Sequence, residues 1–270
     1  MIKKRPSQIQ GERPFRVVTI GALALVVSFF AIILVALAAY TDTKTLFSIL
    51  LSQEILFAIR LTLFTATVST ILAMIFAIPA AYAISNARFP GKDIVDTILD
   101  VPIVLSPVAL GAALLVFFNT SLGSAIEGGL MRFVFELPGI VLAQFTVVIA
   151  LAIRLLKSTF DGIDQRYEQV GRTLGYTKGQ VFMRITLPLA KNGVIAAGIL
   201  TWARAVGEFG ATVTVAGATK MKTETLPVAI FLNLATAEVD KAVAVIFILV
   251  AVATGALVIL RKVTGKRRFE

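Results

Sequence analysis

Long apolar stretches separated by short polar segments dominate the pattern of this sequence. Five stretches contain no Asp, Glu, Lys or Arg: residues 17–41, 61–87, 101–126, 137–153 and 242–260. Each is close to or above the roughly 18 to 20 residues that cross about 30 Å of hydrocarbon as a helix. A sixth stretch, residues 192–218, is apolar apart from Arg204 and Glu208. The pattern predicts an all-α polytopic membrane protein.

The distribution of Lys and Arg predicts how these spans are oriented. With six spans and the N-terminus inside, 19 basic residues fall on the cytoplasmic side and six on the outer side, and Arg204 alone lies within a span. Five spans would place the basic cluster at residues 261–268 outside, against the positive-inside tendency. We therefore expect six transmembrane helices and both termini in the cytoplasm, in a multi-pass protein of the cell membrane.

Composition narrows the possible functions. Hydrophobic residues make up 57% of the 270 positions and the mean hydropathy is +0.89, against roughly 45 to 50% apolar residues in ordinary soluble proteins. The net charge of +10 does not indicate nucleic-acid binding, because the placement of Lys and Arg matters more in a membrane protein. The chain has no Cys and no His, the residues of thiol, imidazole and most zinc chemistry. We expect no metal site, no catalytic residue and no enzymatic activity in this chain.

The N-terminal region resembles a secretory signal, since basic residues precede an apolar run that contains Ala36-Leu37-Ala38. That run is longer than the roughly 7 to 15 residues of a signal core, so we expect a retained first helix. No low-complexity linker or long soluble segment follows. Residues 1–270 are therefore expected to form a single transmembrane domain.

A polar segment rich in Arg and Gly, residues 167–190, lies between the fourth and fifth spans. Its spaced positions are Gln169, Val170, Gly171, Gly175, Ile185, Leu187 and Pro188. The spacing resembles the cytoplasmic loop with which the membrane subunit of an ABC importer docks onto its ATPase. That loop reads Glu-Ala-Ala, three free positions, Gly, nine free positions, Ile, one free position, Leu-Pro. The intervals match throughout, and the triplet differs.

The local chemistry of this loop predicts two short helices with a tight corner. Asp164 can cap a first helix that runs through Leu174, because its carboxylate can accept free amide protons of the first turn. Gly175 then stands where a helix end favours a left-handed residue. Thr177 and Gln180 have the spacing of a capping box, so a second helix is expected to start there and run toward Ile185.

Pro188 predicts a break before the next span, since it lacks an amide proton and constrains the residue before it. A basic loop held on anionic membrane lipid is the alternative to docking, but lipid binding does not require the observed spacing. Glu168 and Gln169 both compete for the polar contact that the family's Glu makes with the ATPase. The docking loop covers about residues 157–191, and its docking residues are Arg166, Tyr167, Glu168, Gln169, Val170, Gly171, Arg172, Thr173, Leu174, Gly175, Ile185, Leu187 and Pro188.

The sequence contains no Gly-rich phosphate loop ending in Gly-Lys-Ser or Gly-Lys-Thr, so this chain cannot hold the phosphates of ATP in that way. Hydrolysis is then expected on a separate partner subunit. The resemblance implies a MetI-like permease fold with the coupling-helix loop between spans four and five. It also implies a homodimer, two ATPase subunits that hold ATP and Mg²⁺, and an external oxyanion-binding protein. The chain itself is expected to bind no cofactor.

Arg204 and Glu208 stand four residues apart, where opposite charges can pair on a helix. Both are costly inside a bilayer and should face protein or water. The pair favours a structural or gating role, and the alternative is that Arg204 helps an anion through. Further pathway or gate candidates are Ser106, Pro107, Thr212, Thr214, Lys220 and Lys222. Lys220 and Lys222 could attract a dianion, and the favoured alternative is an ordinary solvated loop or a contact with the binding protein.

The residues 204–212 and 223–227, together with Ser106-Pro107, resemble molybdate/tungstate and sulfate permeases. The expected function is therefore a permease subunit that translocates molybdate or tungstate, with sulfate or thiosulfate as the alternative substrate. A self-contained secondary transporter would need its own coupling-ion site, and Glu208 is the only acid deep in a predicted span. An intramembrane enzyme is disfavoured by the absence of a convincing nucleophile and base pair.

Overall fold

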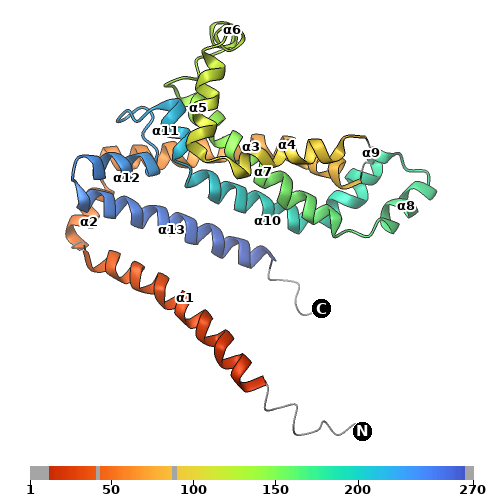
Figure 1. Ribbon diagram of the computed structural model, residues 1–270, viewed down its shortest axis with the longest axis horizontal. Coiled ribbons are helices and arrows are strands. Elements are labelled where there is room, and N and C mark those ends of the chain that lie inside the picture. The colour runs from red at the N-terminus through yellow and green to blue at the C-terminus, as the bar shows by residue number, and fades with distance from the viewer. Residues whose placement is uncertain (1–11, 41–42, 87–89, 265–270) are drawn as a thin grey trace. The chain divides into compact units, whose positions relative to one another are not determined.

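A computed structural model describes residues 12–40, 43–86 and 90–264, and these divide into two compact units with the boundary between Ser48 and Ile49. The first unit contains α1 (Glu12–Tyr40), which confirms the first predicted span, and α2 (Thr43–Leu50) crosses the boundary between the units. All regular elements among the described residues are helices (Figure 1). The all-helical fold predicted from the sequence is confirmed, and the single domain stays a prediction.

Four long helices of the second unit run side by side (Figure 1): α3 (Gln53–Asn86), α7 (Leu137–Asp161), α10 (Leu187–Val206) and α13 (Val239–Thr264). The buried face of α3 is made largely of small residues (Ala, Ser and Thr), including Ala66, Ala73, Ala77 and Ala81, each fully buried. Small side chains let two helix backbones approach closely, which is how membrane helices pack without a hydrophobic driving force. α3 and α7 accordingly share the most extensive helix contact of the unit.

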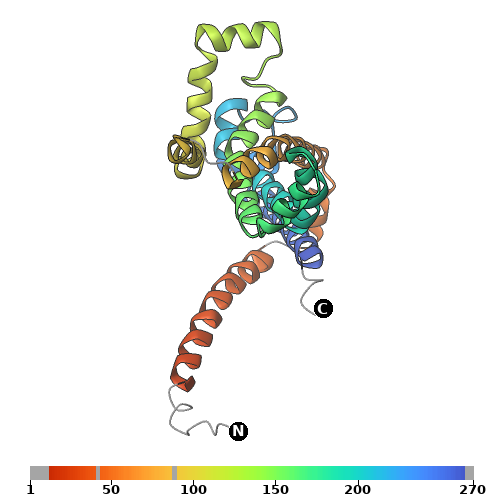
Figure 2. The ribbon, with the colours of Figure 1, turned by 90° about the vertical axis from the view of Figure 1, so that its right-hand side faces the viewer.

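The predicted third span, residues 101–126, is not one straight helix. α4 (Lys92–Val104) and α5 (Pro107–Phe118) meet at 109°, and α6 (Ser121–Gly129) follows. Pro107 constrains Ser106 to an extended backbone, and the Ser106 hydroxyl accepts a hydrogen bond from the Ala109 amide. α5 packs against α11 and α7, whereas Figure 2 shows α6 standing away from the bundle. Five described helices are long and apolar enough to cross a membrane, or six if the bent pair counts as one span.

The span predicted over residues 192–218, the fifth along the chain, is also not a single helix. α10 ends at Val206, and α11 (Gly210–Ala216) is a separate short helix. At the other end, α9 (Lys178–Val181) continues through a π-helical turn, Phe182–Thr186, into α10. The predicted break before Pro188 is therefore wrong, because the wider π turn accommodates a proline without an interruption of the helix.

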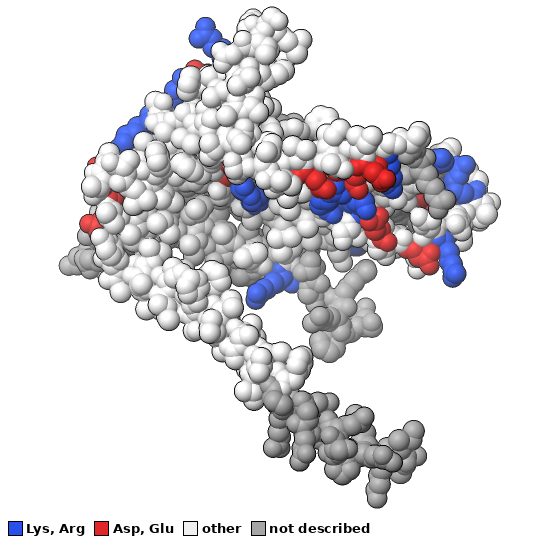
Figure 3. Space-filling model, viewed as in Figure 1, with Lys and Arg blue, Asp and Glu red and all other residues white. Residues whose placement is uncertain are grey.

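Charged side chains gather toward the end of the second unit that carries α4, α8 and α9, next to a broad uncharged middle (Figure 3). Arg154 of α7 bonds Asp96 and Asp100 of α4, both at 2.6 Å, and so ties the amphipathic α4 to the bundle. α12 (Leu226–Ala235) lies at the opposite end (Figure 1). This distribution matches a bundle that crosses about 30 Å of hydrocarbon between two polar surfaces.

Candidate functional site

The first short helix of the predicted loop is α8 (Arg166–Thr173), which lies at the charged end of the bundle. Asp164 Oδ1 accepts a hydrogen bond from the Arg166 amide at 2.9 Å, but Gln165 rather than Asp164 holds the N-cap position, and the helix ends one residue before Leu174. Gly175 has φ +88°, and the prediction of a left-handed residue is confirmed. Its amide bonds the Arg172 carbonyl, and the Tyr176 amide bonds the Gly171 carbonyl, both at 3.1 Å. Together these bonds form a Schellman corner.

The second predicted short helix is not a separate element, because α9 is the first turn of a continuous stretch that runs to Val206, but it starts with the predicted capping box, which is confirmed. The Thr177 hydroxyl accepts from the Gln180 amide at 3.3 Å, and the Gln180 side chain accepts from the Thr177 amide at 2.8 Å. We call α8, α9 and the π turn the docking elbow. Gly171 is buried inside it, and a Cβ there would lie only 2.5 Å from Ile185 Cδ1. The structure thus brings together two motif residues that are distant in sequence.

The outward face of α8 is apolar. Tyr167, Val170 and Leu174 are 56%, 57% and 72% exposed, and their spacing places them on one side of a helix. We call these three residues the docking face. An exposed apolar stripe among charged residues is typical of a surface that another protein covers. Leu187 and Pro188 do not belong to this face, since they lie in the first turn of α10.

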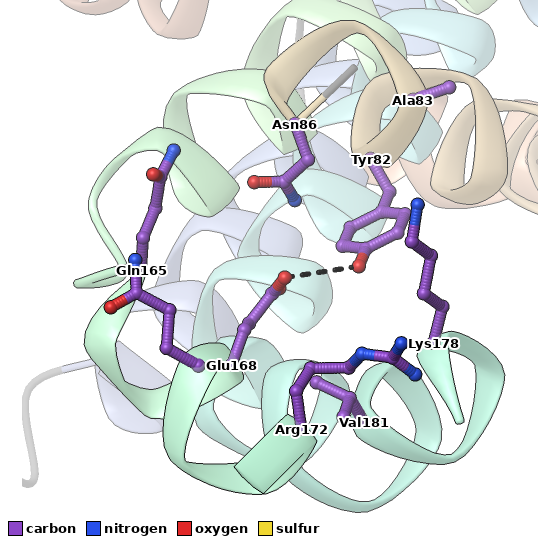
Figure 4. A pocket seen from close by; sticks show the side chains of 9 residues that line it. Tyr82, Ala83, Asn86, Gln165, Glu168, Arg172, Lys178 and Val181 are labelled. Carbon is purple, nitrogen blue, oxygen red and sulfur yellow. Dashed lines mark hydrogen bonds between the residues drawn. The ribbon is translucent and has the colours of Figure 1, made fainter. Parts of the chain in front are cut away.

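Glu168 and Gln169, which the sequence could not separate, differ in exposure and in hydrogen bonding, although both line one cavity. The Glu168 carboxylate accepts a hydrogen bond from the Thr186 hydroxyl at 2.6 Å and one from the Tyr82 hydroxyl at 3.3 Å. Gln169 is exposed. Figure 4 shows Glu168 and Tyr82 pointing toward each other beside a cavity of about 530 Å³ between α3 and the elbow. Arg172 and Lys178 also line that cavity.

The Arg204 and Glu208 pair forms, but not on one continuous helix. Arg204 Nη1 lies 2.7 Å from Glu208 Oε2, and Glu208 stands in the gap between α10 and α11. Its other oxygen accepts a hydrogen bond from the Ala211 amide at 3.0 Å. The Glu208 side chain is 1% exposed, whereas that of Arg204 is 38% exposed. The buried carboxylate therefore has both a counter-charge and a backbone donor.

The break at Ser106 and Pro107 lies against this gap. A Cβ on Gly210 would lie 3.0 Å from Pro107 Cβ, and a Cβ on Gly111 would lie 2.8 Å from Thr214 Cβ. The half-helices α5 and α11 therefore pack at the close distance that glycine permits. Within the described residues the buried Thr212 hydroxyl has no hydrogen-bond partner, and the Thr214 hydroxyl donates to the Gly210 carbonyl at 2.7 Å.

Lys220 and Lys222 lie apart from this gap, in the loop between α11 and α12, and each has an acidic partner. Lys220 Nζ lies 2.8 Å from Glu54 Oε1, and Lys222 Nζ lies 2.6 Å from Glu136 Oε1. Sequence reasoning missed both glutamates, because they are far away in the chain and no spacing links them. The pairs pin the loop to α3 and to the start of α7, and they reduce the positive charge left for an anion.

With this geometry in view, comparison with known proteins decides the family. The family model for the binding-protein-dependent transport system inner membrane component matches residues 69–267. The chain belongs to this family of permeases. The resemblance to importer permeases of the molybdate, tungstate and sulfate branch, inferred from the sequence, is confirmed.

Several relatives of the permease are curated proteins. The molybdenum transport system permease protein ModB of Mycobacterium tuberculosis is 35% identical over 91% of this chain and 92% of its own length. The molybdate/tungstate transport system permease protein WtpB of Thermococcus kodakarensis is 32% identical over 84% and 86%. The sulfate transport system permease protein CysW of Synechococcus elongatus is 37% identical over 63% and 60%.

Solved structures share the fold of the permease. A chain of a bacterial ABC transporter for the import of alginate has a TM-score of 0.77 at 17% identity and covers 97% of this chain. A chain of the inward-facing MetNI methionine ABC transporter has a TM-score of 0.55 at 14% identity, over 79% of this chain. The predicted MetI-like permease fold of a multi-pass membrane protein is confirmed.

Proposed function

We propose that this permease translocates molybdate or tungstate through the membrane as part of an ATP-driven importer, after an external binding protein delivers the oxyanion. Among the relatives compared above, those that align over more than four fifths of the chain are named for molybdenum, molybdate or tungstate. Sulfate is the second candidate, because a sulfate permease aligns over a shorter share at similar identity. Arg204 and Glu208 serve as a structural or gating pair in this proposal.

The docking elbow carries the proposal. Its exposed apolar face lies beside charged side chains at one end of the bundle and consists of Tyr167, Val170 and Leu174. A partner protein in the aqueous phase can reach this face. The partner is an ATPase subunit that holds ATP and Mg²⁺, and it hydrolyses ATP in place of this chain. Gln169 makes the polar contact with the ATPase, because it is exposed while both oxygens of Glu168 are already engaged.

The working assembly contains two copies of this chain and two ATPase subunits. Both termini and the docking elbow lie in the cytoplasm, as the excess of basic residues on that side indicates. The gap between α10 and α11 faces the pathway, where the buried Glu208 fixes Arg204 and the start of α11. Lys220 and Lys222 hold the outer loop in place through their ion pairs.

Reconstitution tests this function directly. The chain is placed in liposomes with its candidate ATPase and binding protein, and ATP hydrolysis is measured while molybdate, tungstate and sulfate are titrated. We expect molybdate and tungstate to stimulate hydrolysis at lower concentrations than sulfate. Equal indifference to all three oxyanions would refute the substrate, and failure of the ATPase to bind would refute the docking.

A further inference from the structure

Three aromatic rings join the helices at the base of the docking elbow. The ring of Tyr82 in α3 lies 4.5 Å from that of Phe182 in the π turn and 5.8 Å from that of Phe160 in α7, centroid to centroid. Phe160 and Phe182 are themselves 6.2 Å apart. Edge and tilted contacts of this kind stabilise packed aromatic side chains beyond their buried area. Tyr82 therefore links α3 to α7 and to the π turn that leads into α10.

The Glu168 carboxylate connects α8 to this junction. One of its oxygens accepts from Thr186, whose side chain is buried at the end of the π turn, and the other accepts from the Tyr82 hydroxyl. Hydrogen bonds to an ionised acceptor are stronger than neutral ones. A single side chain of the elbow is thereby bonded to α3 and to the root of α10.

Further contacts tie the parts of the elbow to one another, as transmission of movement requires. Arg172 Nη1 donates to the Tyr176 carbonyl at 2.9 Å, and the Arg184 guanidinium lies 5.6 Å from the centre of the Tyr176 ring. Gly171 leaves no room between α8 and Ile185. A push on the docking face therefore displaces α8 as a body, and its inward-facing side chains move with it.

We propose that Glu168 is the positioning residue that transmits movement of the docking elbow to α3 and α10, while its neighbour Gln169 serves attachment to the ATPase. This rests on the proposed docking of the ATPase. The two adjacent residues then have separable roles: Gln169 sets how tightly the ATPase binds, and Glu168 sets how much transport each hydrolysis event yields.

The test compares Glu168→Ala with Gln169→Ala in the reconstituted full transporter, with ATPase affinity and molybdate uptake per ATP as separate readouts. Glu168→Ala should keep the affinity within about two-fold and lower uptake per ATP by at least about five-fold, the lower end of typical coupling between sites. Gln169→Ala should weaken affinity and leave uptake per bound ATPase unchanged. Tyr82→Phe and Thr186→Val should each reproduce part of the loss, and neither should add to it in a double variant with Glu168→Ala.

A distance measurement separates transmission from simple stabilisation. Because the chain has no Cys, Thr173→Cys in α8 and Lys191→Cys in α10 give unique spin-label sites. The distribution of distances between the two labels should stay narrow during ATP binding when Glu168 is present. The same distribution should broaden in the Glu168→Ala variant. Identical distance distributions, or a loss of affinity equal to the loss of uptake, would overturn the proposal for Glu168. No ATPase binding by the unaltered chain would instead overturn the docking, and this proposal with it.

Discussion

Gly175 offers a sharp test of the elbow, because its contribution is purely conformational. Its φ of +88° belongs to the left-handed region, and a Cβ placed there meets no atom within 4 Å. The penalty for an L-residue in that conformation is about 1 to 2 kcal/mol. A penalty of this size changes the population of the closed corner by roughly 5- to 30-fold. Gly175→Ala should therefore weaken ATPase binding and coupled uptake without any steric clash.

The matched control is Gly179→Ala. Gly179 lies in α9, has no left-handed φ, and also leaves open space around a Cβ. Alanine favours a helix by about 1 kcal/mol over glycine, so this variant should bind the ATPase at least as well as the unaltered chain. Gly175→Asn should lose less than Gly175→Ala, since Asn tolerates the left-handed region, and the β-branched Gly175→Val should lose more.

The assay is the dissociation constant of the ATPase for the reconstituted chain, together with molybdate uptake. The reasoning is refuted if Gly175→Ala binds like the unaltered chain, or if Gly179→Ala loses as much affinity. An effect that follows side-chain volume at Gly175, with Asn worse than Ala, would also contradict a conformational cause.

Three further predictions follow from the described contacts. Leu174→Asp should weaken ATPase binding by about ten-fold or more, since burial of a Leu side chain contributes about 1.5 to 3 kcal/mol. Thr173→Asp beside it should have a smaller effect, and equal losses of affinity would contradict the assignment of Leu174 to the docking face. Arg204→Gln leaves Glu208 buried without its counter-charge and should destabilise the fold by about 3 to 5 kcal/mol in thermal unfolding. Adding Glu208→Gln should restore most of that stability, and no recovery would contradict a stabilising ion pair between the two residues. Burial raises the pKa of Glu224 above its ordinary value of 4.5, so the folded state holds this proton more tightly than the unfolded state does. The stability of the fold should therefore fall as pH rises above about 4.5 toward the folded pKa. Glu224→Gln should abolish this fall and be more stable than the unaltered chain at pH 7, and an unchanged pH profile of stability would contradict the burial of this carboxylate.

Local chemistry made the docking elbow predictable from the sequence. A left-handed glycine, a capping box and the hydrogen bond that Asp164 accepts from the first amide of α8 depend on residues within a few positions of one another, so spacing alone indicates them. The elbow's inward and outward sides were not predictable. Glu168 and Gln169 are adjacent, and which of them faces Tyr82 depends on how α8 packs against α3, a helix far away in the chain.

The interruptions of the helices were harder to predict, because an apolar stretch gives no hydropathy signal where its backbone bends. The sequence shows Ser106-Pro107 as a motif, yet only the packing of α5 against Gly210 shows that this motif starts a half-helix. At Pro188 the sequence predicts a break, but the π turn before it keeps the helix continuous. The acidic partners of Lys220 and Lys222 are likewise tertiary contacts without a sequence period.

Site-directed cross-linking tests the central claim, attachment of an ATPase to the docking elbow, most directly. In this Cys-free chain, Leu174→Cys is placed on the docking face, and Met221→Cys, which is 50% exposed in the loop between α11 and α12, serves as the control. In membrane vesicles that contain the whole importer, we predict a cross-link to the ATPase from position 174 and none from position 221. A cross-link from position 221 alone, or labelling of position 174 by an impermeant reagent from the outer side, would contradict the account.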